Sequence, residues 1–491
     1  MSPGKQDYYG LLGLRRDASQ EDVKRAYVEA AQKFHPDRNT AAGETEIFLE
    51  VQQAYETLSN PRRRVQYDAT LPPEESINRP YIHKLLASRP QLIRMDEPQM
   101  LYVILELDAP QEARQVPAPP LNVCLVLDRS TSMQGEKMDM VKAAAIQVLR
   151  NLRPHDVLSV VTFSDRAEVV IPAAFYQERT RLEAKIQMIH PSGATEIYQG
   201  LEAGVKEVMR SLDSRRVNHL ILLTDGHTYG DEQECLALAT RISEQGIGIS
   251  AMGIGREWND IFLDVLATRT GGSSAFIAQP QDIKRLLMEK FNALALIYAD
   301  EVILNLRPRD GIDLSYAFRL QPDPSPVILD NPLRLGTILQ DASTQILFEY
   351  MIQPKAVKSD STIILDGTLK VAIASQPLPV PPLPLRLSRP VTNLANSEPP
   401  DPTIVQALSR LMLYRMQERA QEEIRNGRID SATRHLQSLA STLASQGEHG
   451  LAQTVMLEVN HLQRQSVLTP EGSKKMNYGT RALLNAPPKK E

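Results

Sequence analysis

The sequence contains only two cysteines, Cys124 and Cys235, and one tryptophan among 491 residues. So few cysteines exclude a disulfide framework and favour a reducing compartment such as the cytosol. No apolar run reaches the roughly 18 residues that a membrane-spanning helix needs. The opening MSPGKQDYYGLLGL lacks the long apolar stretch and the small-residue cleavage site of a signal peptide. We therefore expect a cytoplasmic protein that is not associated with a membrane.

Neither sign of charge is in large excess, because the formal net charge is only −5. This balance does not favour nucleic acid or an anionic membrane as a partner. The length predicts several domains. We predict a multidomain chain with a helical domain at 1–70, a linker at 71–92, strands at 93–118 that join a β-sandwich, an α/β domain at 119–296, the sandwich itself at 297–390, a linker at 391–402, a helical domain at 403–485 and a disordered tail at 486–491.

The first 70 residues show helical periodicity. Ser19 and Asp22 form a capping-box pattern before a helix whose apolar residues recur at helical spacing. That helix ends in KFHPDRN, where Pro36 stops it because proline lacks the amide donor. A second amphipathic helix follows the polar loop. The pattern predicts a hairpin of antiparallel helices with His35 and Asp37 at an exposed corner.

This region resembles the J domain of DnaJ-type co-chaperones along its whole length. The motifs that carry the resemblance are DYYGLLGL at 7–14, KRAY at 24–27, HPD at 35–37, QQAYETLSNP before residue 62, and RRRVQYD at 62–68. The resemblance implies that a DnaK-type chaperone is the partner and that its ATPase is stimulated. It implies that the chaperone is contacted by His35, Pro36, Asp37, Lys24, Arg25 and Tyr27.

The basic helix face is thinner than is usual in that family, because Val28 and Glu29 stand where Lys or Arg is common. A basic face suits an acidic partner surface and speeds encounter. An ordinary solvated face is the alternative interpretation of Lys24 and Arg25. A catalytic role for His35 is disfavoured, since no nucleophile lies near it in the sequence.

The central region alternates buried strands with amphipathic helices. LNVCLVLD, VLSVVTFS, VNHLILLTD and IGISAMGIG read as buried parallel strands, with helices near 180–189, 196–212 and 231–246. This alternation predicts a doubly wound, Rossmann-like α/β sheet, in which ligands gather at the carboxyl ends of the strands. Oxygen-bearing side chains follow those ends at Asp128, Ser130, Ser132, Thr195 and Asp225. Hard oxygen ligands of this kind suit Mg²⁺ or another divalent cation.

The same region resembles the von Willebrand factor type A fold, whose metal-ion-dependent adhesion site matches D-x-S-x-S at 128–132 with Thr195 and Asp225. The resemblance implies that Ser130, Ser132 and Thr195 bind the metal directly, and that Asp128 and Asp225 bind it directly or through water. A partner's acidic residue would complete the metal shell. The alternative is a degenerate site in which Asp128 and the serines only cap the next helix. Asp165 and His227, near the same rim, are interpreted as ordinary loop residues.

The flanking segments predict two further structures. Strand patterns after residue 300, with the segment 95–118, indicate a β-sandwich into which the α/β domain is inserted. The proline-rich stretch 376–390 is interpreted as an edge strand and linker, with a recruiting motif as the alternative. From 403, three helical patterns separated by Gly427 and Gly447 predict a helical bundle. Packing and partner docking both remain open as roles for these helices.

These features predict a bacterial adaptor and not an enzyme, since no phosphate-binding loop, zinc-protease motif or nucleophile elbow is present. The J domain would stimulate a DnaK-type chaperone, and the metal site would hold an acidic client. A second hypothesis is an assembly scaffold that works with a MoxR-type AAA ATPase. A third is a metal-dependent hydrolase, which is disfavoured because no general base accompanies the metal set.

Overall fold

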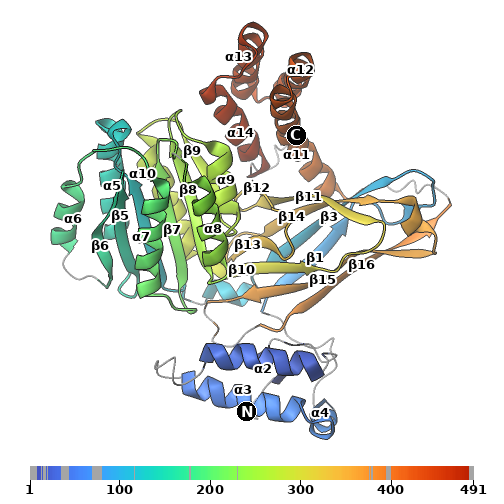
Figure 1. Cartoon of the computed structure of the whole chain (residues 1–491). Coiled ribbons are helices and arrows are strands. Elements are labelled where there is room, and N and C mark those ends of the chain that lie inside the picture. The colour runs from blue at the N-terminus through green and yellow to red at the C-terminus, as the bar shows by residue number, and fades with distance from the viewer. Residues whose placement is uncertain are drawn as a thin grey trace.

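The computed structural model describes residues 8–485 except 13, 15–17, 19, 35–43, 69–79, 116, 176–178, 229, 375, 377–379 and 394–399. Its described residues form an N-terminal helical domain, a central α/β domain, a β-sandwich and a C-terminal helical domain (Figure 1). This is the predicted class of fold. Among the described helices, none combines the length and the hydropathy required to cross a membrane.

The N-terminal domain is built on the predicted helical hairpin. Its core includes Val23 from the first long helix and Val51, Ala54 and Leu58 from the second, all fully buried. Asn60 accepts a hydrogen bond from the backbone amide of Arg63 at 3.3 Å and so caps the last helix. The helices are α1 (Tyr8–Leu11), α2 (Gln20–Phe34), α3 (Glu44–Leu58) and α4 (Pro61–Asp68).

The central domain contains a six-stranded sheet in the order β6-β5-β4-β7-β8-β9. All its neighbouring strands are parallel except β5 and β6, which are antiparallel. Every residue of the inner strands β5, β4 and β7 is buried, and the fourth inner strand, β8, is buried at all but one position, which explains their near-continuous apolar sequences. The strands are β4 (Leu121–Asp128), β5 (Val157–Phe163), β6 (Ala167–Ala174), β7 (Val217–Thr224), β8 (Ile247–Ile254) and β9 (Ser274–Ile277).

Helices cover both faces of this sheet (Figure 1). One face packs against α5 (Glu136–Arg150), α6 (Arg179–Gln187) and α10 (Asp282–Ala295), and the other against α7 (Ile197–Arg210), α8 (Glu232–Ser243) and α9 (Asp260–Thr268). The helices expected near 180–189, 196–212 and 231–246 correspond to α6, α7 and α8. The sequence patterns had not indicated α9, α10 or the edge strands β6 and β9.

The sandwich consists of two five-stranded sheets, in the orders β1-β3-β14-β11-β12 and β13-β10-β15-β16-β2. Apolar residues of both sheets share one core. The strands are β1 (Ile82–Ala87), β2 (Leu92–Ile93), β3 (Gln99–Asp108), β10 (Ile297–Leu306), β11 (Ile312–Gln321), β12 (Ser325–Pro326), β13 (Leu333–Leu339), β14 (Thr344–Ile352), β15 (Ser361–Ala372) and β16 (Leu383–Thr392).

Strands from both sides of the central domain build the sandwich. β3 precedes that domain and pairs antiparallel with β14, which follows it, from Gln99 opposite Ile352 to Leu107 opposite Thr344. The central domain is therefore inserted into the sandwich. The prediction of a linker at 71–92 was wrong in part, because β1 begins at Ile82 and pairs with β3. The prediction that a second linker begins at 391 was also wrong, because β16 continues to Thr392.

The C-terminal domain contains four described helices, one more than the three sequence patterns indicated. Asp401 caps the first, its side chain accepting a hydrogen bond from the amide of Thr403 at 2.8 Å. Gly427 and Gly447 have φ angles of 74° and 80° two positions after the last residues of α11 and α12, where helix-ending glycines stand. The helices are α11 (Pro402–Arg425), α12 (Ile429–Ser445), α13 (His449–Gln465) and α14 (Pro470–Asn485).

Two of these helices dock on the rest of the molecule. From α11, Leu411 and Tyr414 pack with Phe318 and Leu347 of the sandwich. From α14, the Tyr478 ring lies 6.0 Å from the Trp258 ring of the central domain, measured between centroids. The helical domain therefore contacts both the sandwich and the central domain. The disordered tail predicted at 486–491 lies outside the described residues.

Candidate functional site

The carboxyl ends of β4 and β7 bring two aspartates to one edge of the central sheet. Asp128 is the last residue of β4, and Asp225 directly follows β7, which pairs with β4 in parallel. Both residues are almost completely buried, with 0% and 1% exposure. Burying two carboxylates close together is unfavourable unless a positive charge or hydrogen-bond donors compensate.

Two of the predicted hydroxyls join these aspartates through hydrogen bonds. The backbone amide of Ser130 donates to Oδ1 of Asp128 at 2.8 Å, and the two hydroxyls of Ser130 and Ser132 lie 3.0 Å apart. Ser132 Oγ donates to Oδ1 of Asp225 at 2.6 Å. Ser132 is exposed, whereas Ser130 is buried. The four side chains thus form one polar cluster that reaches the surface through Ser132.

Thr195 approaches this cluster from the loop before α7. A Cβ atom placed on Gly226, the neighbour of Asp225, would lie 3.0 Å from Thr195 Oγ1. Glycine at 226 therefore permits the close approach of the threonine hydroxyl. In the described part of the chain no hydrogen bond joins Thr195 to the other four residues, so its place in the set rests on this proximity.

Asp165 supports the loop that carries Thr195, a role that its interpretation as an ordinary loop residue missed. Its Oδ1 accepts a hydrogen bond from the backbone amide of Ala194. The loop is also tied to the segment after β4, since the Thr131 amide donates to the Gly193 carbonyl at 3.1 Å. Sequence patterns could not reveal this contact, because 29 positions separate Asp165 from Ala194. His227, the other rim residue, is exposed.

Thr224 and Lys137 are two further residues of the site that sequence reasoning missed. The Thr224 hydroxyl donates to Oδ2 of Asp128 at 2.6 Å. The Lys137 ammonium donates to Oδ2 of Asp225 and, at 3.3 Å, to the Ser132 carbonyl. Burial raises the pKa of the Asp128 carboxyl, and the nearby Asp225 charge raises it further, while hydrogen bonds from Thr224 and Ser130 oppose the shift. A cation beside Asp128 would offset this penalty on its ionised form.

The donor set fits a hard divalent cation by its chemistry. It contains carboxylate and hydroxyl oxygens, which Mg²⁺ prefers, and the sulfur and imidazole ligands typical of zinc sites are missing from it. Within the described ranges, no cluster of three or more His, Cys, Asp or Glu side chains could hold a metal. A metal at this edge would therefore need the hydroxyls of Ser130, Ser132 and Thr195 in addition to the two carboxylates.

The predicted chaperone-binding residues are described only in part. Lys24 and Arg25 are exposed on α2, and Arg25 forms an ion pair with Asp22 of the same helix. Tyr27 instead stacks on Tyr55 of α3, with ring centroids 4.2 Å apart, so it contributes to packing within the hairpin. His35, Pro36 and Asp37 lie outside the described residues.

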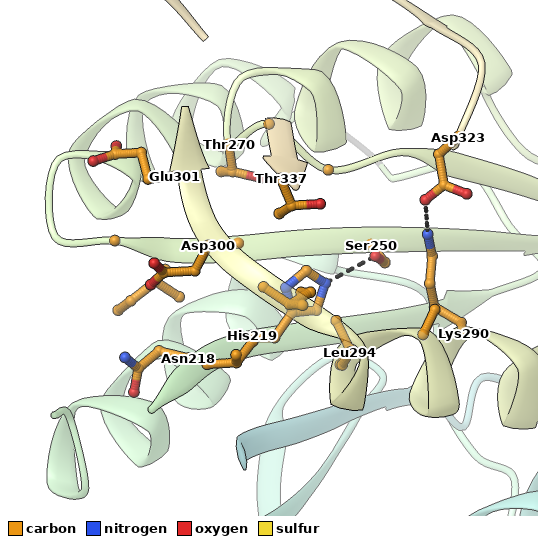
Figure 2. A pocket seen from close by; sticks show the side chains of 18 of the residues that line it. Asn218, His219, Ser250, Thr270, Lys290, Leu294, Asp300, Glu301, Asp323 and Thr337 are labelled. Carbon is orange, nitrogen blue, oxygen red and sulfur yellow. Dashed lines mark hydrogen bonds and ion pairs between the residues drawn. The ribbon is translucent and has the colours of Figure 1, made fainter. Parts of the chain in front are cut away.

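A separate cavity of about 170 Å³ lies at the opposite edge of the sheet, where the central domain meets the sandwich (Figure 2). Its polar groups largely bind one another. His219 Nε2 lies 2.8 Å from the Ser250 hydroxyl, and Lys290 pairs with Asp323 at 2.5 Å. Burial and the charge of Lys290 lower the pKa of His219 to about 3, so its imidazole is neutral.

Comparison with known families agrees with this architecture. Residues 7–68 match the family model of the DnaJ domain, residues 122–289 that of the von Willebrand factor type A domain, and residues 402–486 that of the Sll0103-like C-terminal α-helical domain. The protein therefore joins a J domain to a von Willebrand factor type A domain, abbreviated vWA domain below. The helical domain at its C-terminus is of the Sll0103-like type.

Curated relatives divide into two groups. The uncharacterized protein sll0103 of Synechocystis is 27% identical over 384 residues, which cover 75% of this chain and 89% of that protein. DnaJ homolog subfamily B member 12 of Mus musculus is 56% identical over 63 residues, and the chaperone protein DnaJ of Cyanothece is 54% identical over 63. Each of these two matches covers 13% of this chain and 17% of the relative, so the likeness is confined to the J domain.

Two solved structures share the fold of most of the chain. The von Willebrand factor type A protein of Catenulispora acidiphila superposes with a TM-score of 0.62 at 16% identity, covering 82% of this chain and 96% of that one. The ArnB paralog VWA2 of Sulfolobus acidocaldarius gives 0.50 at 16% identity, covering 83% and 99%. At such identities the likeness concerns the fold alone.

Proposed function

We propose that this protein is a J-domain adaptor that delivers a DnaK-type chaperone to a client held at the vWA domain. The observation that carries the proposal is the polar cluster of Asp128, Ser130, Ser132 and Asp225 on a chain that also contains a J domain. The cluster opens to the surface through Ser132. An open, oxygen-lined site on a domain without evident catalytic groups is suited to holding a partner.

Asp128, Ser130, Ser132, Thr195 and Asp225 would hold a divalent cation, Mg²⁺ by preference. When bound, the cation supplies a concentrated positive charge that a carboxylate of the client can neutralise. The protein's own residues fix the arrangement. Thr224 orients Asp128 through its hydroxyl, and Asp165 holds the loop that carries Thr195.

The J domain would supply the second interaction. Lys24 and Arg25 present positive charge on α2, which suits an acidic surface on the chaperone. His35, Pro36 and Asp37 would engage the chaperone as the DnaJ likeness implies. Because both domains belong to one chain, a client at the vWA domain meets the recruited chaperone at a high effective concentration. The protein would thereby direct chaperone action to one class of client in the cytoplasm.

Stimulation of a DnaK-type ATPase tests the J-domain half of the proposal. The full-length His35→Gln variant should lose stimulation and retain the unfolding temperature of the wild type. An exposed histidine far from the J domain, changed in His449→Gln, provides the control and should stimulate normally. Equal stimulation by the wild type and His35→Gln would refute chaperone recruitment through this domain.

Affinity capture from the native cytoplasm, with Mg²⁺ or with chelator, tests the client-binding half. The Asp128→Ala variant should lose the metal-dependent partner and still stimulate the chaperone. Recovery of a MoxR-type AAA ATPase as the main partner would favour the assembly scaffold instead. A hydrolytic activity that disappears in Asp225→Ala would contradict the adaptor and identify an enzyme.

A further inference from the structure

An arginine adjoins the polar cluster of the vWA domain. Arg129 lies between Asp128 and Ser130, at the first variable position of D-x-S-x-S. Its backbone amide donates to the carbonyl of Phe163, the last residue of β5, at 2.8 Å. The loop that begins the candidate metal site is therefore fastened to the end of β5, and Arg129 is the residue that makes this connection.

The side chain of Arg129 is held in one direction, toward β6. Nη1 donates to the Ser192 hydroxyl at 2.6 Å, and the Ser192 amide donates to the Arg129 carbonyl at 2.7 Å. Nη2 lies 3.8 Å from a carboxylate oxygen of Glu168, a residue of β6. In the sheet, β5 and β6 lie on one side of β4 and β7 lies on the other, so the guanidinium and Asp225 are on opposite sides of Asp128. A group fixed in advance loses little conformational entropy when it binds a partner.

The positive charge of Arg129 is only loosely compensated by the chain itself. The Arg129 side chain is 21% exposed and that of Glu168 is 66% exposed. Of the other charged residues in the turn between β5 and β6, Asp165 accepts a hydrogen bond from the Ala194 amide, and Arg166 is exposed. An ion pair so open to water contributes little free energy. A carboxylate from another molecule can therefore displace Glu168 from the guanidinium.

The spacing of the strands indicates how far this guanidinium lies from the candidate metal position. The cation would bind at the edge between β4 and β7, and the guanidinium lies one to two strands away, so roughly 5–10 Å separate them. In an extended peptide, side chains two residues apart point the same way at a distance of ~7 Å, whereas adjacent side chains point to opposite faces. A client carboxylate on the cation would thus bring the carboxylate two residues away, and not that of its immediate neighbour, to Arg129.

We propose that Arg129 is a second client-binding group beside the metal site, and that the vWA domain selects an extended acidic segment with carboxylates two residues apart. This inference rests on the proposed function, because the first carboxylate is the one that would bind the cation. Arg129 would bind the second, since the planar fork of a guanidinium matches a carboxylate. The class of client is thereby narrowed from any acidic partner to one with this spacing.

Two peptides of equal composition and charge test the proposal, both labelled at the N-terminus and amidated at the C-terminus. GSGEGEGSG carries glutamates two residues apart, and GSGEEGGSG carries them side by side. In Mg²⁺, fluorescence anisotropy should show that the full-length wild type binds the first about fivefold more tightly. Arg129→Gln should lose that preference. Arg181→Gln removes an exposed arginine of α6, which carries none of the site residues, and should keep it.

Two further measurements separate client binding from a merely structural role of Arg129. By calorimetry, Arg129→Gln should bind Mg²⁺ at least as tightly as the wild type, because a nearby positive charge is removed and the metal ligands remain. Glu168→Gln frees the guanidinium from its internal carboxylate and should bind GSGEGEGSG more tightly than the wild type. Weaker Mg²⁺ binding by Arg129→Gln, or weaker peptide binding by Glu168→Gln, would overturn the proposal.

The peptides also separate a failure of this inference from a failure of the proposed function. Equally tight, Mg²⁺-dependent binding of both peptides by the wild type, or an unchanged preference in Arg129→Gln, would overturn the role of Arg129 and leave client binding at the metal intact. Failure of both peptides to bind in Mg²⁺ would overturn metal-dependent client binding together with this inference.

Discussion

The Lys137 ammonium donates a hydrogen bond to Oδ2 of Asp225, while the Ser132 hydroxyl occupies Oδ1 of the same carboxylate. A side-chain cation thus lies beside an aspartate expected to bind a metal. Lys137 is itself partly exposed, so it can move away from Asp225, which is buried. The Lys137 ammonium would therefore compete with a bound metal for the Asp225 carboxylate.

Lys137→Met should therefore raise the affinity for Mg²⁺. Removing a positive charge a few ångströms from the metal position should strengthen binding about tenfold at low ionic strength, and less in high salt. Isothermal titration calorimetry on the full chain measures this directly. Lys142→Met, on the same helix but bonded to the Gln187 carbonyl, should leave the affinity unchanged. Weaker Mg²⁺ binding by Lys137→Met would mean that the lysine assists the metal instead.

Asp128→Asn should have opposite effects with and without metal. In chelator, the variant should unfold at a higher temperature than the wild type, because burial and the Asp225 charge raise the pKa of Asp128 and so penalise its ionised form at pH 7. In Mg²⁺ the order should reverse, since the amide cannot neutralise the cation. Thermal unfolding in both buffers checks this, with the exposed Asp139→Asn as control. The same order in both buffers would contradict metal binding at Asp128.

His219 should make the protein sensitive to mild acid. Its pKa in the folded state, about 3, lies below the ordinary 6.5, because burial and the Lys290 charge disfavour the imidazolium. The unfolded chain therefore binds a proton that the folded chain excludes. The contribution of His219 to the free energy of unfolding is complete above pH 6.5 and is lost as the pH falls toward 3. At pH 5 the loss amounts to about 2 kcal/mol.

His219→Gln should remove that part of the pH dependence. Urea unfolding at pH 7 and pH 5 should show a smaller loss of stability for the variant than for the wild type, by about 2 kcal/mol. His190→Gln, at an exposed position, should behave as the wild type. Parallel losses in the wild type and His219→Gln would show that other groups control the acid sensitivity.

Arg481→Leu should loosen the helical domain. It leaves Asp264 without its cationic partner, and breaking a buried ion pair by removing one member costs about 3–5 kcal/mol. Hydrogen exchange of the α14 amides should accelerate. Arg256→Leu, at an exposed ion pair with Glu471 in the same interface, should cost less than about 1 kcal/mol. Equal exchange rates in the two variants would contradict the inference that the ion pair of Arg481 with Asp264 holds α14 in place.

The local patterns of the sequence predicted most elements of the vWA domain and the sandwich. Continuous apolar runs such as LNVCLVLD belong to strands buried on both faces, and the residues that follow such strands meet at one edge for geometric reasons. The aspartates 128 and 225 could therefore be placed together from sequence. The linker at 71–92 was wrong in part, because the exposed, partly charged residues of β1 resemble a linker until pairing with β3 orders them.

The residues that sequence reasoning missed depend on distant partners. Lys137 is an ordinary helix lysine until folding places Asp225 beside it, 88 positions away. The segment that forms α14, PEGSKKMNYGTRALLN, contains two glycines and few apolar residues, so its intrinsic helical signal is weak. Packing of Tyr478 on Trp258 and the pairing of Arg481 with Asp264 stabilise it. Such tertiary contacts leave no periodic pattern in the sequence.

The insertion of the vWA domain between β3 and β10 has a consequence for how this architecture can diversify. The covalent connections to the sandwich lie at the edge of the sheet opposite Asp128 and Asp225, where Val217 and Ile297 line the same cavity. The loops around the aspartates connect strands and helices of the vWA domain itself and are bonded to one another, as in the hydrogen bond from the Thr131 amide to the Gly193 carbonyl. Evolution or an engineer could therefore lengthen or exchange those loops to select new binding partners while the sandwich and the helical domain stay intact.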